Sequence, residues 1–172
     1  MNVPATTLTV GGLFVGMALP LWHISRFAIA QVKRRDPKKA LDLVPLGAGM
    51  LYGGLATATT SGLIGFTTGA ITFLGNGAGS LAMWGATGGT TTLSTRSNLA
   101  ELSGLGNLVL LLITVAVLGA WKGIPGKAKP RMRLGIISGV LLGLSATLGG
   151  WFAAYVIPLI NDAGAALVGT IA

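Results

Sequence analysis

Few side chains in this sequence have the types and spacing needed for catalysis or metal binding. His23 is the only histidine, and the chain contains no cysteine. A zinc or copper site needs several such ligands at close spacing, so none is expected here. A catalytic histidine needs a nucleophile within reach, and Ser61 and Ser138 lack the leading glycine of the Gly-x-Ser-Gly turn found in intramembrane serine proteases. We therefore predict no enzymatic activity, no metal and no cofactor, and interpret His23 as a polar residue near lipid headgroups.

The acidic residues do not favour proton-coupled transport. Such transport normally requires a carboxylate within the membrane, whereas Glu101 and Asp162 lie near the ends of apolar stretches. Glu101 suits the first turn of a helix, where a negative charge complements the helix dipole. The glycine-rich run Gly75-x-Gly77-x-Gly79 lacks the Lys-Ser/Thr continuation of a phosphate-binding loop.

The composition places the chain in the membrane class. It has 172 residues, of which 52% are hydrophobic and only 9% charged, and the mean hydropathy is +0.76. An ordinary soluble domain has about 25% charged residues, which it needs to cover its surface. The composition therefore predicts a single all-α integral membrane domain over residues 1–172.

Two short segments, 33–39 and 122–133, carry net charges of +4 and +5, and the remaining charges sum to −1, which gives the net charge of +8. Lys and Arg next to apolar spans mark the cytoplasmic side, so both segments are expected inside a bacterial cytoplasmic membrane, with both termini outside. They are also predicted to contact anionic lipid headgroups or a polyanionic cargo such as nucleic acid. The predicted contact residues are Lys33, Arg34, Arg35, Lys38, Lys39, Lys127, Lys129, Arg131 and Arg133.

The spacing of apolar stretches predicts about four transmembrane helices, since one crossing takes about 20 residues. They form two out–in–out hairpins, each with a basic inner loop. The predicted spans are approximately residues 7–27, 43–64, 102–121 and 134–156. Between the hairpins lies a Gly/Thr-rich segment, 65–97, in which Gly75-Asn76-Gly77 predicts a turn. This segment is expected to form either an interfacial helix with a loop or a re-entrant pair.

Glycines four residues apart provide the strongest packing signal, because they lie on one helix face and let two backbones approach closely. The glycines predicted to pack helices are Gly12, Gly16, Gly49, Gly53, Gly135, Gly139 and Gly143. They serve either the interior of one four-helix bundle or contacts with neighbouring copies.

These features favour a non-enzymatic protein that self-associates through glycine-rich faces into a pore, ring or filament-like assembly. The chain is similar to phage holins in being small, multi-span and cationic. It is similar to conjugative pilins in its apolar out–in–out hairpin with a basic inner loop, a unit that occurs twice here. Two alternatives remain open: an accessory subunit of a larger membrane complex, or a small channel or carrier for a neutral solute.

Overall fold

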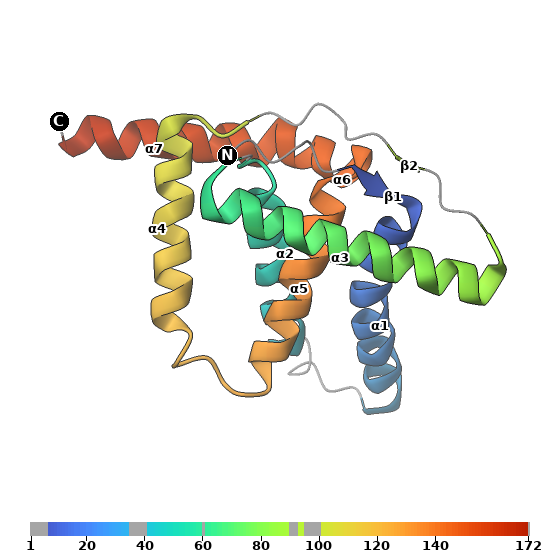
Figure 1. The fold of residues 1–172 in the computed structure, drawn as a ribbon. Helices are drawn as coiled ribbons and strands as arrows, with labels where there is room; N and C mark the ends of the chain where they lie inside the picture. The colour runs from blue at the N-terminus through green and yellow to red at the C-terminus, as the bar shows by residue number, and fades with distance from the viewer. Residues whose placement is uncertain (1–6, 35–40, 60, 90–92, 95–100, 172) are drawn as a thin grey trace.

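The computed structural model describes residues 7–34, 41–59, 61–89, 93–94 and 101–171, which are almost entirely helical. The axes of four upright helices have roughly the same orientation (Figure 1), with α1 (Val10–Arg34) and α4 (Gly104–Ala120) antiparallel to α2 (Val44–Ala56) and α5 (Ala128–Gly143). The transverse helices cross them near one end: α3 (Gly62–Thr87) and the continuous segment α6 (Ala146–Trp151), η2 (Phe152–Val156) and α7 (Ile157–Ile171). Two short strands, β1 (Leu8–Thr9) and β2 (Leu93–Ser94), pair antiparallel.

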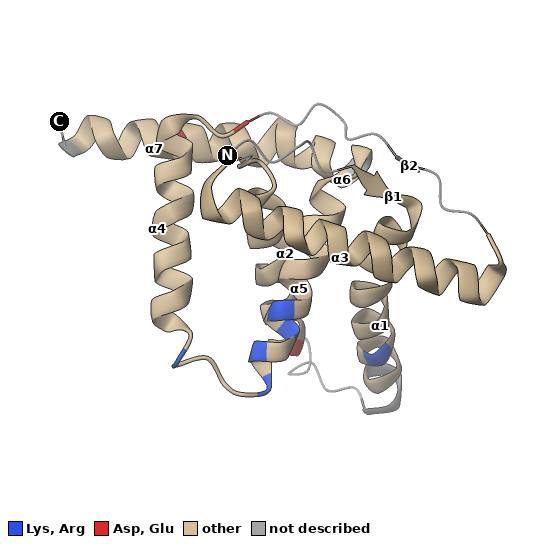
Figure 2. Ribbon diagram, viewed as in Figure 1, with Lys and Arg blue, Asp and Glu red and all other residues tan. Residues whose placement is uncertain are grey.

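Charge is segregated along the upright helices (Figure 2). The basic end of the molecule holds the described cations Arg26, Lys122, Lys127, Lys129, Arg131 and Arg133. Figure 2 shows acidic residues at the opposite end, where Glu101 precedes α4 and Asp162 lies on α7, whereas Asp42 precedes α2 and forms an ion pair with Arg131. The body of the upright helices between these ends carries no charge.

The helical fold class is confirmed, but four full spans are not. Residues Val10–Ala30 and Leu148–Thr170 are long and apolar enough to cross a membrane, whereas Leu41–Ala56 and Gly104–Ala120 are shorter apolar helices. At a rise of 1.5 Å per residue, a helix of the length of Leu41–Ala56 extends about 24 Å, which is less than the roughly 30 Å hydrocarbon core of a typical bilayer.

The Gly/Thr-rich segment differs most from the sequence-based expectation. Helix α3 is continuous from Gly62 to Thr87, so the turn predicted at Gly75-Asn76-Gly77 is wrong. The low helix propensity of these residues is offset because the small-residue face of α3 is buried against other helices. Its buried residues are Gly65, Gly69, Thr72, Gly75 and Gly79.

The helices within the predicted spans 43–64 and 134–156 end before those predictions do. Helix α2 ends at Ala56 and helix α5 at Gly143, in each case where the chain turns into a transverse helix. The turns have related chemistry: Thr57 Oγ1 donates to the Gly54 carbonyl, and Ser145 Oγ donates to the Leu142 carbonyl, both at 2.6 Å. Hydroxyl groups that satisfy backbone carbonyls in this way compete with continuation of the helix.

The second basic segment is partly helical, because α5 begins at Ala128 and so includes Lys129, Arg131 and Arg133. Two apolar clusters hold the helices together, and the first of them includes residues of the transverse helices. One is built around Leu55, Leu110 and Ile157, and the other around Leu8, Leu141 and Leu144.

Candidate functional site: a duplicated helix clamp and a basic cavity

The chain contains two copies of one structural unit. Each copy consists of an upright helix, a basic connection, a second upright helix and a transverse segment: α1, α2 and α3 in the first, and α4, α5 and α6–α7 in the second. Short sequence matches accompany this repeat. Leu8-Thr9 corresponds to Leu102-Ser103, and Asn76-x-Ala78-Gly79 corresponds to Asn161-x-Ala163-Gly164.

In the first unit, Asn76 of the transverse helix α3 clamps the start of the upright helix α1. The Thr9 backbone N–H and the Thr9 hydroxyl both donate to Asn76 Oδ1, at 3.0 Å each. Thr9 Oγ1 in turn accepts from the Gly12 N–H at 3.1 Å, and Asn76 Nδ2 donates to the Thr7 carbonyl at 2.7 Å. The clamp thus satisfies backbone groups that the first turn of a helix leaves without intrahelical partners.

The second unit repeats this clamp with Asn161 of α7 and the start of α4. The Ser103 N–H and hydroxyl donate to Asn161 Oδ1 at 2.9 and 3.0 Å, and the Gly106 N–H donates to Ser103 Oγ at 3.0 Å. In both units the helix is capped by a hydroxyl residue that is itself held by an asparagine from the transverse helix. A Cβ at Gly12 or Gly106 would overlap the asparagine oxygen, which explains the glycine at both positions.

Helices α2 and α5 meet along a reciprocal glycine seam. Gly49 and Gly53 lie against the backbone of α5 at Met132 and Ile136, while Gly135 and Gly139 lie against the backbone of α2 at Leu46 and Met50. This exchange of equivalent contacts is the pattern of a two-fold axis, here relating the two units of one chain. Both helices begin at the basic end, so they run parallel.

The remaining predicted packing glycines also contact this same chain. Gly16 lies against Leu141 and Leu142, and Gly143 lies against Thr57 and Gly54. All seven therefore serve seams inside the chain. Faces available for another copy are formed by other residues.

The two units differ in how closely their first upright helix packs. Ser138 Oγ donates to the Gly16 carbonyl at 2.6 Å, which brings α1 against α5. The equivalent contact, between α4 and α2, has Leu110 in place of Gly16 and Tyr52 in place of Ser138, and Tyr52 Oη lies 3.0 Å from Thr114 Oγ1. These larger side chains leave a crevice of about 260 Å³ between α2, α4 and α5, lined by Tyr52, Thr114, Val117, Leu118, Trp121 and Ile136.

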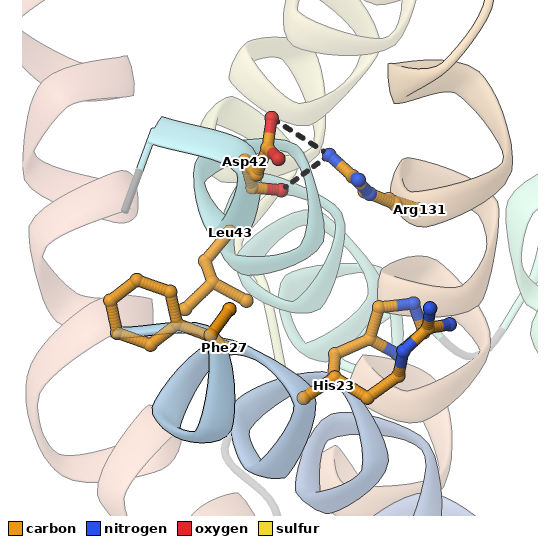
Figure 3. Close-up of a pocket in the computed structure, with 7 residues that line it drawn as sticks. His23, Phe27, Asp42, Leu43 and Arg131 are labelled. Carbon is orange, nitrogen blue, oxygen red and sulfur yellow. Dashed lines mark hydrogen bonds and ion pairs between the residues drawn. The ribbon is translucent and has the colours of Figure 1, made fainter. Parts of the chain in front are cut away.

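A cavity of about 240 Å³ lies at the basic end of the first unit, between α1, the start of α2 and α5 (Figure 3). It is lined by His23, Arg26, Phe27, Ala30, Asp42, Leu43 and Arg131. Arg131 Nη1 lies 3.0 Å from Asp42 Oδ1 and donates to the Asp42 carbonyl at 3.3 Å, so the guanidinium is fixed at two points. His23 Nδ1 lies 3.0 Å from the Leu19 carbonyl.

No family model, curated protein or solved structure matches this chain. Its function is therefore inferred from the geometry of these features. Within the part of the chain that the structure describes, no three His, Cys, Asp or Glu side chains come together as metal ligands.

The predicted lipid-contact residues have different surroundings. Arg131 lines the cavity, while Arg133 lies over the Trp121 ring, 5.4 Å from its centroid. Lys127 is exposed and Lys129 half-buried at the start of α5. Arg35, Lys38 and Lys39, together with the side chains of Lys33 and Arg34, fall outside the described residues.

The sequence analysis did not identify the clamp residues Asn76 and Asn161, and it did not predict that Arg26 lines a cavity. A signal for the clamps is present in the repeated Asn-x-Ala-Gly motif. The cavity has no such signal, because its residues come from three segments far apart in the chain.

Proposed function

We propose that this protein is a non-enzymatic structural subunit embedded in a bacterial cytoplasmic membrane. The observation that carries the proposal is the segregation of charge, with the described cations at one end, two carboxylates at the other and an uncharged body between them (Figure 2). The basic end is placed on the cytoplasmic side, because positive flanks resist translocation. The transverse helices then lie toward the outer face, with both termini outside.

Large apolar side chains on the outer surface support membrane embedding. Leu63 and Phe73 of α3 are 81% and 78% exposed, and Leu118 of α4 and Leu159 of α7 are 67% and 66% exposed. Exposed apolar surface on this scale is unfavourable in water and calls for lipid or protein to cover it. We propose that the four upright helices cross the membrane, with α2 and α5 shielded in the centre, and that the apolar segment Leu148–Thr170 lies across their ends instead of crossing.

Self-association is the proposed role of this outer surface. The two-fold axis of a single chain is filled by the glycine seam, where α2 and α5 are in backbone contact. A pore, ring or filament would therefore form between copies, through outward faces of α3, α4 and α7. Such a subunit could form a membrane pore like that of a phage holin, or part of a conjugative transfer assembly. An accessory subunit would use the same faces against a different protein.

A carrier for a neutral solute is the second candidate, and the duplication favours it. Parallel repeats related by an axis along the membrane normal occur in secondary transporters. The largely uncharged crevice between α2, α4 and α5 is where a solute would bind. Flux of neutral solutes into proteoliposomes, abolished by filling the crevice with Thr114→Trp, would favour the carrier over the structural subunit.

Purification in a mild detergent tests the structural role. A homogeneous oligomer by light scattering supports self-association, whereas a monomer that retains a second protein supports the accessory role. A monodisperse monomer without a partner, together with solute flux, would overturn the proposed assembly.

A further inference from the structure

We propose that the cavity at the basic end of the first unit binds the phosphodiester group of an anionic phospholipid. This inference rests on the proposed membrane embedding, and it assigns a single defined headgroup site where the sequence indicates only diffuse attraction. The cavity combines two arginines, one histidine and one aspartate with two apolar side chains, Phe27 and Leu43.

The charge of the cavity favours an anion. Asp42 is paired with Arg131, so these two charges offset each other. Arg26 has no ion-pair or hydrogen-bond partner among the described residues, which leaves one net positive charge in the cavity. A guanidinium presents five N–H donors, and Asp42 engages only the Nη1 group of Arg131. Both arginines therefore retain donors for phosphate oxygens, which guanidinium groups bind with matching geometry.

His23 adds a further polar group to the same cavity. Its Nδ1 is directed at the Leu19 carbonyl, which can only accept a hydrogen bond. The Nδ1–H therefore donates to that carbonyl, and the Nε2 atom is left as an acceptor, which suits a hydroxyl of the headgroup glycerol and not a phosphate oxygen. This arrangement fixes the ring in one orientation on α1, beside Arg26 one turn further along the helix.

The apolar residues point to a lipid as the source of the phosphate. Phe27 and Leu43 line the cavity, and Leu41 and Val44 next to it are 69% and 60% exposed. Inorganic phosphate would leave this apolar surface exposed to water, whereas the glycerol and acyl chains of a phospholipid would cover it. The cavity also lies at the level where the upright helices meet the basic connections, which is where headgroups are expected.

The second unit provides an internal comparison. At the positions of His23, Arg26 and Phe27, helix α4 carries Val117, Ala120 and Trp121. The aromatic side chain is retained, but both polar residues are replaced by apolar ones. The neighbouring crevice is accordingly lined mainly by apolar residues. We therefore expect one tightly bound anionic phospholipid per chain, at the first unit only.

The test is native mass spectrometry of the full chain in mild detergent, titrated with phosphatidylglycerol or with phosphatidylcholine of the same acyl chains. One phosphatidylglycerol per chain should bind in preference to phosphatidylcholine. Arg26→Ala and His23→Val install the residues of the second unit, and Arg26→Ala should weaken binding at least tenfold, because a charge-assisted hydrogen bond is lost. The matched control Lys127→Gln removes one exposed charge at the same end and should weaken it by no more than about fivefold.

Two further comparisons show which part of the proposal is wrong if the expected binding is not seen. Displacement of phosphatidylglycerol by millimolar inorganic phosphate would overturn the assignment of an anionic lipid. Equal retention of phosphatidylcholine and phosphatidylglycerol would overturn it as well. Equal effects of Arg26→Ala and Lys127→Gln would show that attraction is diffuse and that the cavity is no site. Oligomeric size and membrane insertion are recorded for every variant, so failure of the lipid site is distinguished from failure of the proposed membrane subunit.

Discussion

Asn76 and Asn161 hold equivalent positions in the two units: the Oδ1 atom of each accepts from the backbone N–H and the hydroxyl of the residue that caps the first upright helix of its own unit. Each asparagine thereby ties a transverse helix to the start of an upright one. The clamp is a local device, but it fixes the angle between two helices that differ in direction (Figure 1). Its duplication is the clearest sign that the chain is built from two related halves.

Replacing Asn76 with Ala should destabilise the protein by about 1–3 kcal/mol, because the Thr9 N–H and hydroxyl lose their acceptor. Asn76→Asp keeps an acceptor oxygen at the same place and should retain more of the stability. Thermal unfolding in detergent, followed by circular dichroism, would measure both. Equal stability of Asn76→Ala and the parent would contradict a stabilising role for the clamp.

Asn161→Ala should have a smaller effect, about 1 kcal/mol, because this clamp is more exposed to solvent than that of Asn76. The expected consequence is local: α7 loosens from α4 while the first unit is unaffected. Hydrogen exchange of the α4 amides near Gly106, compared with those near Gly12, reports this difference. Uniform loss of protection across both units would argue against two separate clamps.

The glycine seam predicts opposite effects for neighbouring glycines of α2. A Cβ at Gly49 would overlap the Met132 carbonyl, whereas a Cβ at Gly47 meets nothing within 4 Å. Gly49→Ala should therefore destabilise by about 1–3 kcal/mol through overpacking. Gly47→Ala should be neutral or stabilising by up to about 1 kcal/mol, because it lowers the backbone entropy of the unfolded chain. Thermal melting of the two variants side by side would decide, and equal melting points would contradict the seam.

Gly139→Leu should disrupt folding more strongly, since Gly139 faces the backbone of Met50. Gly119→Leu, on α4, is the matched control because a Cβ there meets nothing within 4 Å. Yield and melting temperature in detergent are the measurements. Normal folding of Gly139→Leu would mean that α2 and α5 are not held in backbone contact.

Asp42→Asn should strengthen retention of phosphatidylglycerol, since it removes the carboxylate that competes for the Arg131 guanidinium. The lipid titration described for Arg26→Ala measures this directly. A drop in lipid retention with unchanged stability would show that the ion pair positions Arg131 for the ligand rather than competing with it.

Much of the helical framework could be predicted from charge and apolar run length. The run ending at Trp121 predicted α4 closely, because an uninterrupted leucine-rich stretch has one plausible structure. Helix α3 could not be found in this way. Its Gly75-Asn76-Gly77 segment is typical of a turn. Its helical state depends on packing against α1 and on the hydrogen bonds of Asn76 with Thr9 and Thr7, which are distant in sequence.

The duplication was visible in sequence only as a repeated plan of spans and basic loops. The matching residues are few, and the equivalent positions around Gly16 and Ser138 carry Leu110 and Tyr52 in the other unit. These replacements keep the fold while changing how tightly α1 and α4 pack. The two units also differ in their open spaces, which are a charged cavity beside α1 and a largely apolar crevice beside α4.

Cysteine accessibility in intact cells directly tests whether the protein is embedded with its basic end in the cytoplasm, because the chain has no native cysteine. Gly126→Cys lies at the basic end and Gly104→Cys at the opposite end, and both positions have open space for a side chain. A membrane-impermeant maleimide should label Cys at position 104 from outside and reach position 126 only after the membrane is permeabilised. Labelling of position 126 in intact cells would contradict a protein that is embedded with its basic end in the cytoplasm.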